Sequence, residues 1–291
     1  MQRFGIGAVL APNEEEKLTN GIGVVTIDVQ PIIVRGTPMP QDEFITRLFC
    51  RIDEQIGFVK KYADETLYAS EVVTLMVLFA IKGGRFSMFY RWISYNHRAL
   101  FPKLPDVTRL SRLFLNHQSW CNEFLADVST LGIIDTYGVE LIHPRREGRS
   151  EQQIGRKGTS NGRWIVGIKV AFLINQRGEI IEWAWDTANV HDTRFRELAT
   201  DYRDEMVVFS DMGFRKAKST PENMHYCARG EWNDRYMIEN ILRWMTDVFQ
   251  SKKIYHRTVQ AIHMRISAIA AAFNILLQMN SYNPSMTWFA L

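Results

Sequence analysis

Two aspartates stand within apolar stretches of the sequence that have the composition of buried strands. Asp135 lies in GIIDTYGVELI and Asp211 ends VVFSD, two residues before Gly213. Charged side chains are rarely buried unless they are paired or bind a metal ion. Each aspartate is therefore either a structural residue, such as a turn cap, or a ligand at a functional site.

Glu239 is a third acidic candidate, on a helix predicted to start near Asn233. Arg235 and Arg243 lie on the same helical face, so Glu239 could equally be an ordinary salt-bridge partner. If the two aspartate strands are neighbours and this helix packs on them, the three carboxylates converge. Such oxygen ligands suit two Mg²⁺ ions, which Mn²⁺ could replace. A metal pair of this kind activates a water or 3′-hydroxyl and stabilises the leaving oxygen of a phosphodiester.

His191 and Asp192 lie where a predicted strand gives way to a helix near 192–202. Aspartate is a preferred helix N-cap, so Asp192 or Thr193 is expected to cap this helix. The alternative is a supporting role, in which His191 and Asp192 lie behind the acidic residues and His191 contacts them or a DNA phosphate. The residues themselves leave both interpretations open.

Basic residues cluster after the first aspartate strand and again after the Glu239 helix. The segment 145–163 also contains glycines and serines, so we predict a flexible loop. A solvated charged loop is the usual explanation of such a run, but a position beside an acidic site favours contacts with DNA phosphates. The predicted DNA-binding residues are Arg145, Arg146, Arg149, Arg156, Lys157, Arg163, Arg235, Lys252 and Lys253.

The elements that must position these residues fall into two regions with different periodicity. Apolar residues between 41 and 128 recur at helical spacing, whereas the period falls to two after Thr130. A hairpin is predicted where the turn residues 175–178 join two apolar strands. Predicted helices start at Gln41 and near Thr108 and span 70–82 and 86–96; predicted strands are 131–143, 163–174, 179–188 and 206–210; later helices are 233–250 and 259–279.

This pattern predicts an α/β protein with a mixed sheet flanked by helices, preceded by an all-helical region. The helical region is 41–128 and is expected to serve in DNA binding or dimerisation, and the mixed region is 129–280. Residues 1–40 contain several Gly and Pro and are predicted to be a leader with one short strand at 23–29, and residues 281–291 a tail.

Composition places few limits on function. The net charge is only +3, so any nucleic-acid binding must depend on local clusters of charge. The three cysteines are far apart and form no CxxC pair, which argues against a zinc ribbon or a disulfide framework and favours reduced thiols in the cytoplasm. The most apolar run, VVTLMVLFAI, is about half the length of a membrane span, so no membrane association is predicted.

Four segments in order along the chain resemble insertion-sequence transposases of the DDE class, and the resemblance covers roughly residues 66–279. The segments are GIIDTYGVELIHP (132–144), WIVGIKVAFLINQRGEIIEWAWDTANVHD (164–192), FSDMGF (209–214) and NDRYMIE (233–239). The resemblance implies a ribonuclease-H-like catalytic domain. It also implies that Asp135, Asp211 and Glu239 are the catalytic, metal-binding triad.

The same resemblance implies Mg²⁺-dependent cleavage of DNA ends and strand transfer of an insertion sequence. The expected partners are double-stranded DNA, as element ends and as target, and a second copy of the chain in a homodimer. The expected location is the cytoplasm, in association with the nucleoid. Two alternatives stay open: an inactive DNA-binding derivative of a transposase, and a ribonuclease-H-like nuclease without strand transfer.

Overall fold

The computed structural model describes residues 39–61, 66–160, 162–216, 221–228 and 235–280, without the side chains of 235–237. The described residues belong to one compact unit. The strand predicted at 23–29 and the predicted tail lie outside the described residues, as does nearly all of the predicted leader.

The first part of this unit is helical, as predicted. Its helices form because apolar residues recur every three to four positions and face one core. The helix α2 is buried along almost its whole length, which explains its uninterrupted apolar sequence. The elements are α1 (Gln41–Ile56), α2 (Ala69–Lys82), α3 (Phe86–Asn96), α4 (Val107–Asn116) and the short 3₁₀ helix η1 (Gln118–Phe124).

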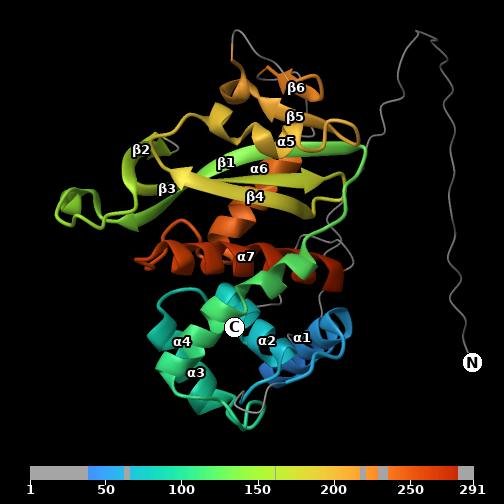
Figure 1. Cartoon of the computed structure of the whole chain (residues 1–291), viewed down its shortest axis with the longest axis vertical. Coiled ribbons are helices and arrows are strands. Elements are labelled where there is room, and N and C mark those ends of the chain that lie inside the picture. The colour runs from blue at the N-terminus through green and yellow to red at the C-terminus, as the bar shows by residue number, and fades with distance from the viewer. Residues whose placement is uncertain (1–38, 62–65, 161, 217–220, 229–234, 281–291) are drawn as a thin grey trace, which may run out of the picture. The chain divides into compact units, whose positions relative to one another are not determined.

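The second part is a six-stranded mixed sheet with the order β2-β3-β1-β5-β6, in which β4 also pairs with β3 (Figure 1). The strands β1, β3 and β4 are antiparallel neighbours, whereas β5 is parallel to β1 and β6 is parallel to β5. The predicted hairpin is confirmed. The strands are β1 (Leu131–Ile142), β2 (Arg156–Ser160), β3 (Arg163–Asn175), β4 (Ile180–Thr187), β5 (Val207–Asp211) and β6 (Met224–Cys227).

Helices cover both faces of this sheet. Side chains alternate along β1, so Ile133 and Val139 join the core cluster of α6 and α7, whereas Ile134 joins the cluster on the opposite face. The helices α6 (Arg235–Asp247) and α7 (Val259–Met279) lie on the first face, and η3 (Asp192–Phe195) and α5 (Glu197–Thr200) lie on the second. Two further 3₁₀ turns are η2 (Pro144–Arg146) and η4 (Met212–Phe214).

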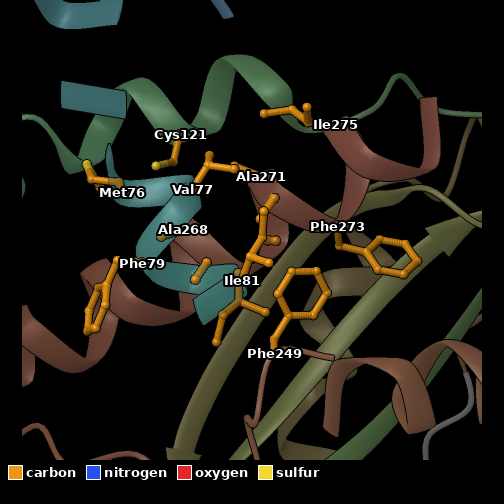
Figure 2. Close-up of a cluster of buried hydrophobic side chains, with 14 of the residues drawn as sticks. Met76, Val77, Phe79, Ile81, Cys121, Phe249, Ala268, Ala271, Phe273 and Ile275 are labelled. Carbon is orange, nitrogen blue, oxygen red and sulfur yellow. The ribbon is translucent and has the colours of Figure 1, made fainter. Parts of the chain in front are cut away.

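The helix α7 joins the sheet to the first helices, and lies between them in Figure 1. Its side chains share one buried cluster with α2 and with the segment after α6, as Phe79, Phe249 and Phe273 show in Figure 2. The fully buried Asn274 accepts a hydrogen bond from Ile180 N at 2.8 Å and donates one to Phe124 O at 2.9 Å. The helical region and the sheet therefore share one core.

By length and apolar composition alone, α7 could cross a membrane. However, 78% of its most apolar window is buried inside the protein. The same test is passed by core helices of soluble proteins, and the packing of α7 against α2 and β4 explains its composition.

The structure corrects three predictions about secondary structure. The segment 145–163 is not simply a flexible loop, because it contains η2 and the strand β2. The strand β6 was not predicted, since its four residues are too few to establish a period. The helix predicted near 192–202 is two short pieces, and its N-cap is His191 rather than Asp192 or Thr193.

The polar strand β2 is held in place by tertiary contacts. A Cβ atom on Gly158 would lie 2.0 Å from the carbonyl oxygen of Ala188, so only glycine allows this approach of two backbones. The amide of Gly138 also donates a hydrogen bond to Ser160 Oγ at 3.2 Å. The sequence RKGTS resembles a loop because its pairing depends on these close contacts rather than on apolar alternation.

The pH dependence of stability is expected to report on His256, in the connection between α6 and α7. Burial, and secondarily the nearby charge of Arg265, lowers the pKa of this imidazole from 6.5 to about 4. Between those two values the unfolded chain binds a proton that the folded chain does not, so stability falls as the pH falls from about 6.5 towards 4. The loss attributable to His256 is about 2 kcal/mol at pH 5.

We expect His256→Phe to flatten this pH dependence, because phenylalanine does not bind a proton. The variant should still fold, because phenylalanine keeps an aromatic contact with Phe79, whose ring centroid is 6.0 Å from that of His256. Urea unfolding at pH 7 and pH 5 measures the difference. The exposed His225 provides the matched control, and His225→Phe is expected to retain the wild-type slope. An equal loss of stability in wild type and His256→Phe would contradict the assignment.

Candidate active site

The pairing of β1 with β5 brings the two predicted aspartates together. These strands are parallel, and the last pair of residues in register is Ile133 with Phe209. Two residues further along each strand are Asp135 and Asp211. Side chains of registered neighbours in parallel strands point to the same side of a sheet, so the two carboxylates lie at one level on adjacent strands. The sequence prediction depended on this adjacency, which the topology provides.

Both aspartates line one pocket at the point where β5 ends. Each carboxylate is oriented by a local backbone amide: Thr136 N donates to Asp135 Oδ1 at 2.7 Å, and Gly213 N donates to Asp211 Oδ1 at 2.9 Å. Apolar side chains from β1 and α6 form much of the wall. The residues that line the pocket are Ile133, Ile134, Asp135, Ser210, Asp211, Cys227 and Ile238.

Asp192 approaches the same site from the opposite face of the sheet. Its Oδ1 atom accepts hydrogen bonds from Thr136 Oγ1 at 2.8 Å and from Lys169 Nζ at 2.9 Å. A Cβ atom on Gly213 would lie 2.9 Å from both Asp192 Oδ2 and Asp211 Oδ1. Gly213 therefore lies between two carboxylates, and its lack of a side chain permits that arrangement.

His191 is exposed, and its Nδ1 atom accepts a hydrogen bond from Thr193 N at 3.4 Å as the cap of η3. Asp192 is thereby free of the capping role and turns to Thr136 and Lys169 instead. The cap of this helix is therefore His191 and not Asp192, and the supporting role stays a prediction for both residues.

Comparison of the chain with protein-family models, curated proteins and solved structures finds no match. The chemistry of the site must therefore be inferred from its own residues.

Glu239 lies next to this pocket rather than in it. The helix α6 contacts β1, and Ile238 faces the pocket, but the following side chain of Glu239 is exposed. Successive residues on a helix point about 100° apart, which accounts for the difference. Within the described part of the chain, no three His, Cys, Asp or Glu side chains are grouped to hold a metal ion. The side chain of Arg235 lies outside the described residues.

Lys169 was not identified by sequence reasoning. It stands within the apolar strand WIVGIKVAFLI, where a largely buried cation needs a partner just as a carboxylate does. Its Nζ atom reaches Val190 O at 2.8 Å as well as Asp192. The lone lysine in that strand was the available signal, but its partner was invisible without the fold.

Apart from Arg235, the predicted DNA-binding residues flank the carboxyl-terminal half of β1. Lys252 and Lys253 are exposed and lie along one edge of β1, where Lys253 Nζ contacts Glu140 Oε1 at 2.7 Å. On the other edge, β3 carries β2 and the preceding turn. The exposed basic residues on that side are Arg145, Arg146, Arg149, Arg156, Lys157 and Arg163.

The donor set is compatible with Mg²⁺ at the level of ligand type. The two aspartates in the pocket offer carboxylate oxygens, which hard cations prefer, and Mg²⁺ commonly uses one or two carboxylates together with water and substrate phosphate. Two adjacent carboxylates also repel each other, and a bound cation removes that cost.

Proposed function

We propose that this protein is a DDE-type transposase that cleaves and joins DNA with Mg²⁺ bound to Asp135 and Asp211. The observation that carries the proposal is the position of these two aspartates at one level of adjacent parallel strands, lining one pocket. A rigid sheet is suited to hold two ligands at a fixed separation.

The order of the strands supports a ribonuclease-H-like catalytic domain. Three antiparallel strands, β4, β3 and β1, are followed by β5 and β6, which run parallel to β1. Helices lie on both faces, and α6 follows the last strand. This arrangement is compatible with such a domain, and it has Asp135 on the central strand β1 and Asp211 on its parallel neighbour β5.

In this proposal Asp135 and Asp211 hold the metal, and the local amides of Thr136 and Gly213 keep the two carboxylates oriented. When bound, Mg²⁺ would supply activation of the attacking oxygen and stabilisation of the leaving oxygen. Glu239 is assigned the third carboxylate, which requires its exposed side chain to turn towards the pocket when DNA and metal bind. Asp192 braces the turn after Asp211.

The basic residues on both edges of β1 are assigned to the DNA backbone, where they would position a strand across the pocket. Double-stranded DNA is the proposed partner, both as element ends and as target. A homodimer in the DNA complex is part of the proposal, because two ends must be cut and joined together. Such a protein would act in the cytoplasm at the nucleoid.

The test is a cleavage and joining assay with the purified full chain. The DNA is a plasmid that carries the sequences flanking the reading frame, because those contain the ends of any insertion sequence. Nicking at these ends followed by joining to target DNA, in Mg²⁺ or Mn²⁺ and not in EDTA, is expected. Nicking without joining would indicate a nuclease, and binding without nicking would indicate an inactive derivative; either outcome would overturn the proposal.

A further inference from the structure

The hairpin formed by β2 and β3 presents an exposed tryptophan. The side chain of Trp164 is 62% exposed, although a tryptophan is among the costliest residues to leave in water. Lys157 Nζ lies over one face of its ring, 5.0 Å from the centroid. An aromatic face beside a cation is the arrangement that binds nucleic-acid bases and their phosphates.

The register of the hairpin explains this pair. Trp164 is opposite Thr159, and Lys157 is opposite Val166, so the lysine and the tryptophan are diagonal neighbours on one face of the ribbon. Arg156 and Arg163 are also exposed and point to the other face. The hairpin is therefore basic on both sides and aromatic on one.

The hairpin is held to the rest of the sheet. The backbone of Gly158 approaches that of Ala188, and Ser160 Oγ accepts a hydrogen bond from Gly138 N, three residues beyond Asp135. A platform that is already fixed loses little conformational entropy when it binds a ligand. Trp164 is therefore held at a fixed distance from Asp135 in the proposed active site.

Trp164 lies on the same face of the sheet as Asp135. The register pairs Asp135 with Phe172, and Phe172 and Trp164 are an even number of residues apart on β3. The eight residue steps from Phe172 to Trp164 span about 26 Å at roughly 3.3 Å per step. At about 3.4 Å per nucleotide, this separation corresponds to roughly eight nucleotides of one DNA strand.

We propose that Trp164 and Lys157 form a stacking platform for an unpaired base in the DNA, roughly eight nucleotides from the cleavage site. The base would stack on the face of the indole ring that Lys157 does not cover, and Lys157 with Arg156 and Arg163 would bind the neighbouring phosphates. The exposed positive charge around the ring favours DNA over a neutral or basic protein surface. The inference deepens the proposed function, because it assumes that DNA is the substrate.

The experiment compares two DNA probes by fluorescence anisotropy in EDTA, so that no cleavage occurs. One probe is a blunt duplex, and the other is the same duplex with a single-stranded extension of about eight nucleotides. Trp164→Ala is expected to weaken binding of the extended probe by about 5- to 150-fold, the range for losing one base–aromatic stack. The affinity for the blunt duplex should be unchanged, and Trp164→Phe should retain most of the affinity for the extended probe.

Tyr95→Ala is the matched control, because Tyr95 is an exposed aromatic residue on α3, outside the hairpin, and 83% exposed. Lys157→Gln is expected to weaken binding of both probes. It should also lower the number of counterions released on binding, measured from the salt dependence of the affinity, by about one. Equal affinities of Trp164→Ala and wild type for the extended probe would overturn the inference. An equal loss on both probes would also overturn it, because the contact would then be to duplex DNA.

The outcome can be separated from that of the proposed function. A preference for the extended probe that depends on Trp164 but accompanies no metal-dependent cleavage would support the platform and reject the transposase. Cleavage and joining by a Trp164→Ala protein that binds both probes with wild-type affinity would support the transposase and reject the platform.

Discussion

Asp135→Asn and Asp211→Asn are each expected to reduce Mg²⁺-dependent DNA cleavage by more than about a hundredfold, because loss of a direct metal ligand should exceed the roughly 10–100-fold effect of losing a residue that supports one. Asparagine keeps the shape of the side chain and its hydrogen bond from Thr136 N or Gly213 N. It removes the negative charge that a divalent cation needs. DNA binding in EDTA should persist in both variants.

The measurement is the initial rate of plasmid nicking over a range of Mg²⁺ and Mn²⁺ concentrations. Asp204→Asn is the matched control, since Asp204 is an exposed aspartate in the turn before β5 and does not line the pocket. A fully active Asp211→Asn protein would exclude the proposed mechanism. Full activity of Glu239→Gln, by contrast, would limit the metal ligands to the two aspartates in the pocket.

Arg265→Ala is expected to destabilise the fold by about 3–5 kcal/mol, through a cavity and through buried carbonyl groups that lose their donor. Arg265 is on α7 and is 1% exposed. Its guanidinium donates to Phe79 O at 2.6 Å, to Ala80 O at 3.3 Å and to Phe249 O at 3.2 Å, and lies 4.4 Å from the centroid of the Phe79 ring. Burial lowers the pKa of this group to about 10.

The large effect follows from what Arg265 connects. One side chain joins the end of α2, the start of the connection after α6, and α7, so its loss loosens the helical region and the sheet together. Arg265→Lys should recover only part of the stability, because a single ammonium cannot reproduce the planar set of donors. Urea unfolding at pH 7 measures the change, with the exposed Arg112→Ala as control. A loss below about 1 kcal/mol in Arg265→Ala would show that the carbonyls find other partners.

The sequence was most informative where the pattern was long and periodic. The span of α7 was predicted without error, and α2 and the hairpin of β3 and β4 to within one or two residues, because each has many apolar residues at one spacing. The polar β2 and the four-residue β6 were missed for the opposite reason. Their pairing depends on neighbours that are distant in the chain, which no local pattern records.

The candidate site divides in the same way. Asp135 and Asp211 could be named as candidates from the sequence, because burying a carboxylate in an apolar strand is costly unless the charge is paired or binds a cation. Lys169 and Trp164 were not recognised, since their significance depends on what lies across the strand from them.

The sequence by itself therefore determined the long periodic elements and pointed to the two aspartates as candidates, because local spacing and the cost of burying charge are properties of the chain. The tertiary structure decided which residues meet. The parallel register of β1 and β5 sets Asp135 beside Asp211, and the approach of Gly213 to Asp192 joins the second face of the sheet to the same site. The rotation of α6 leaves Glu239 exposed, because its neighbour Ile238 takes the buried position.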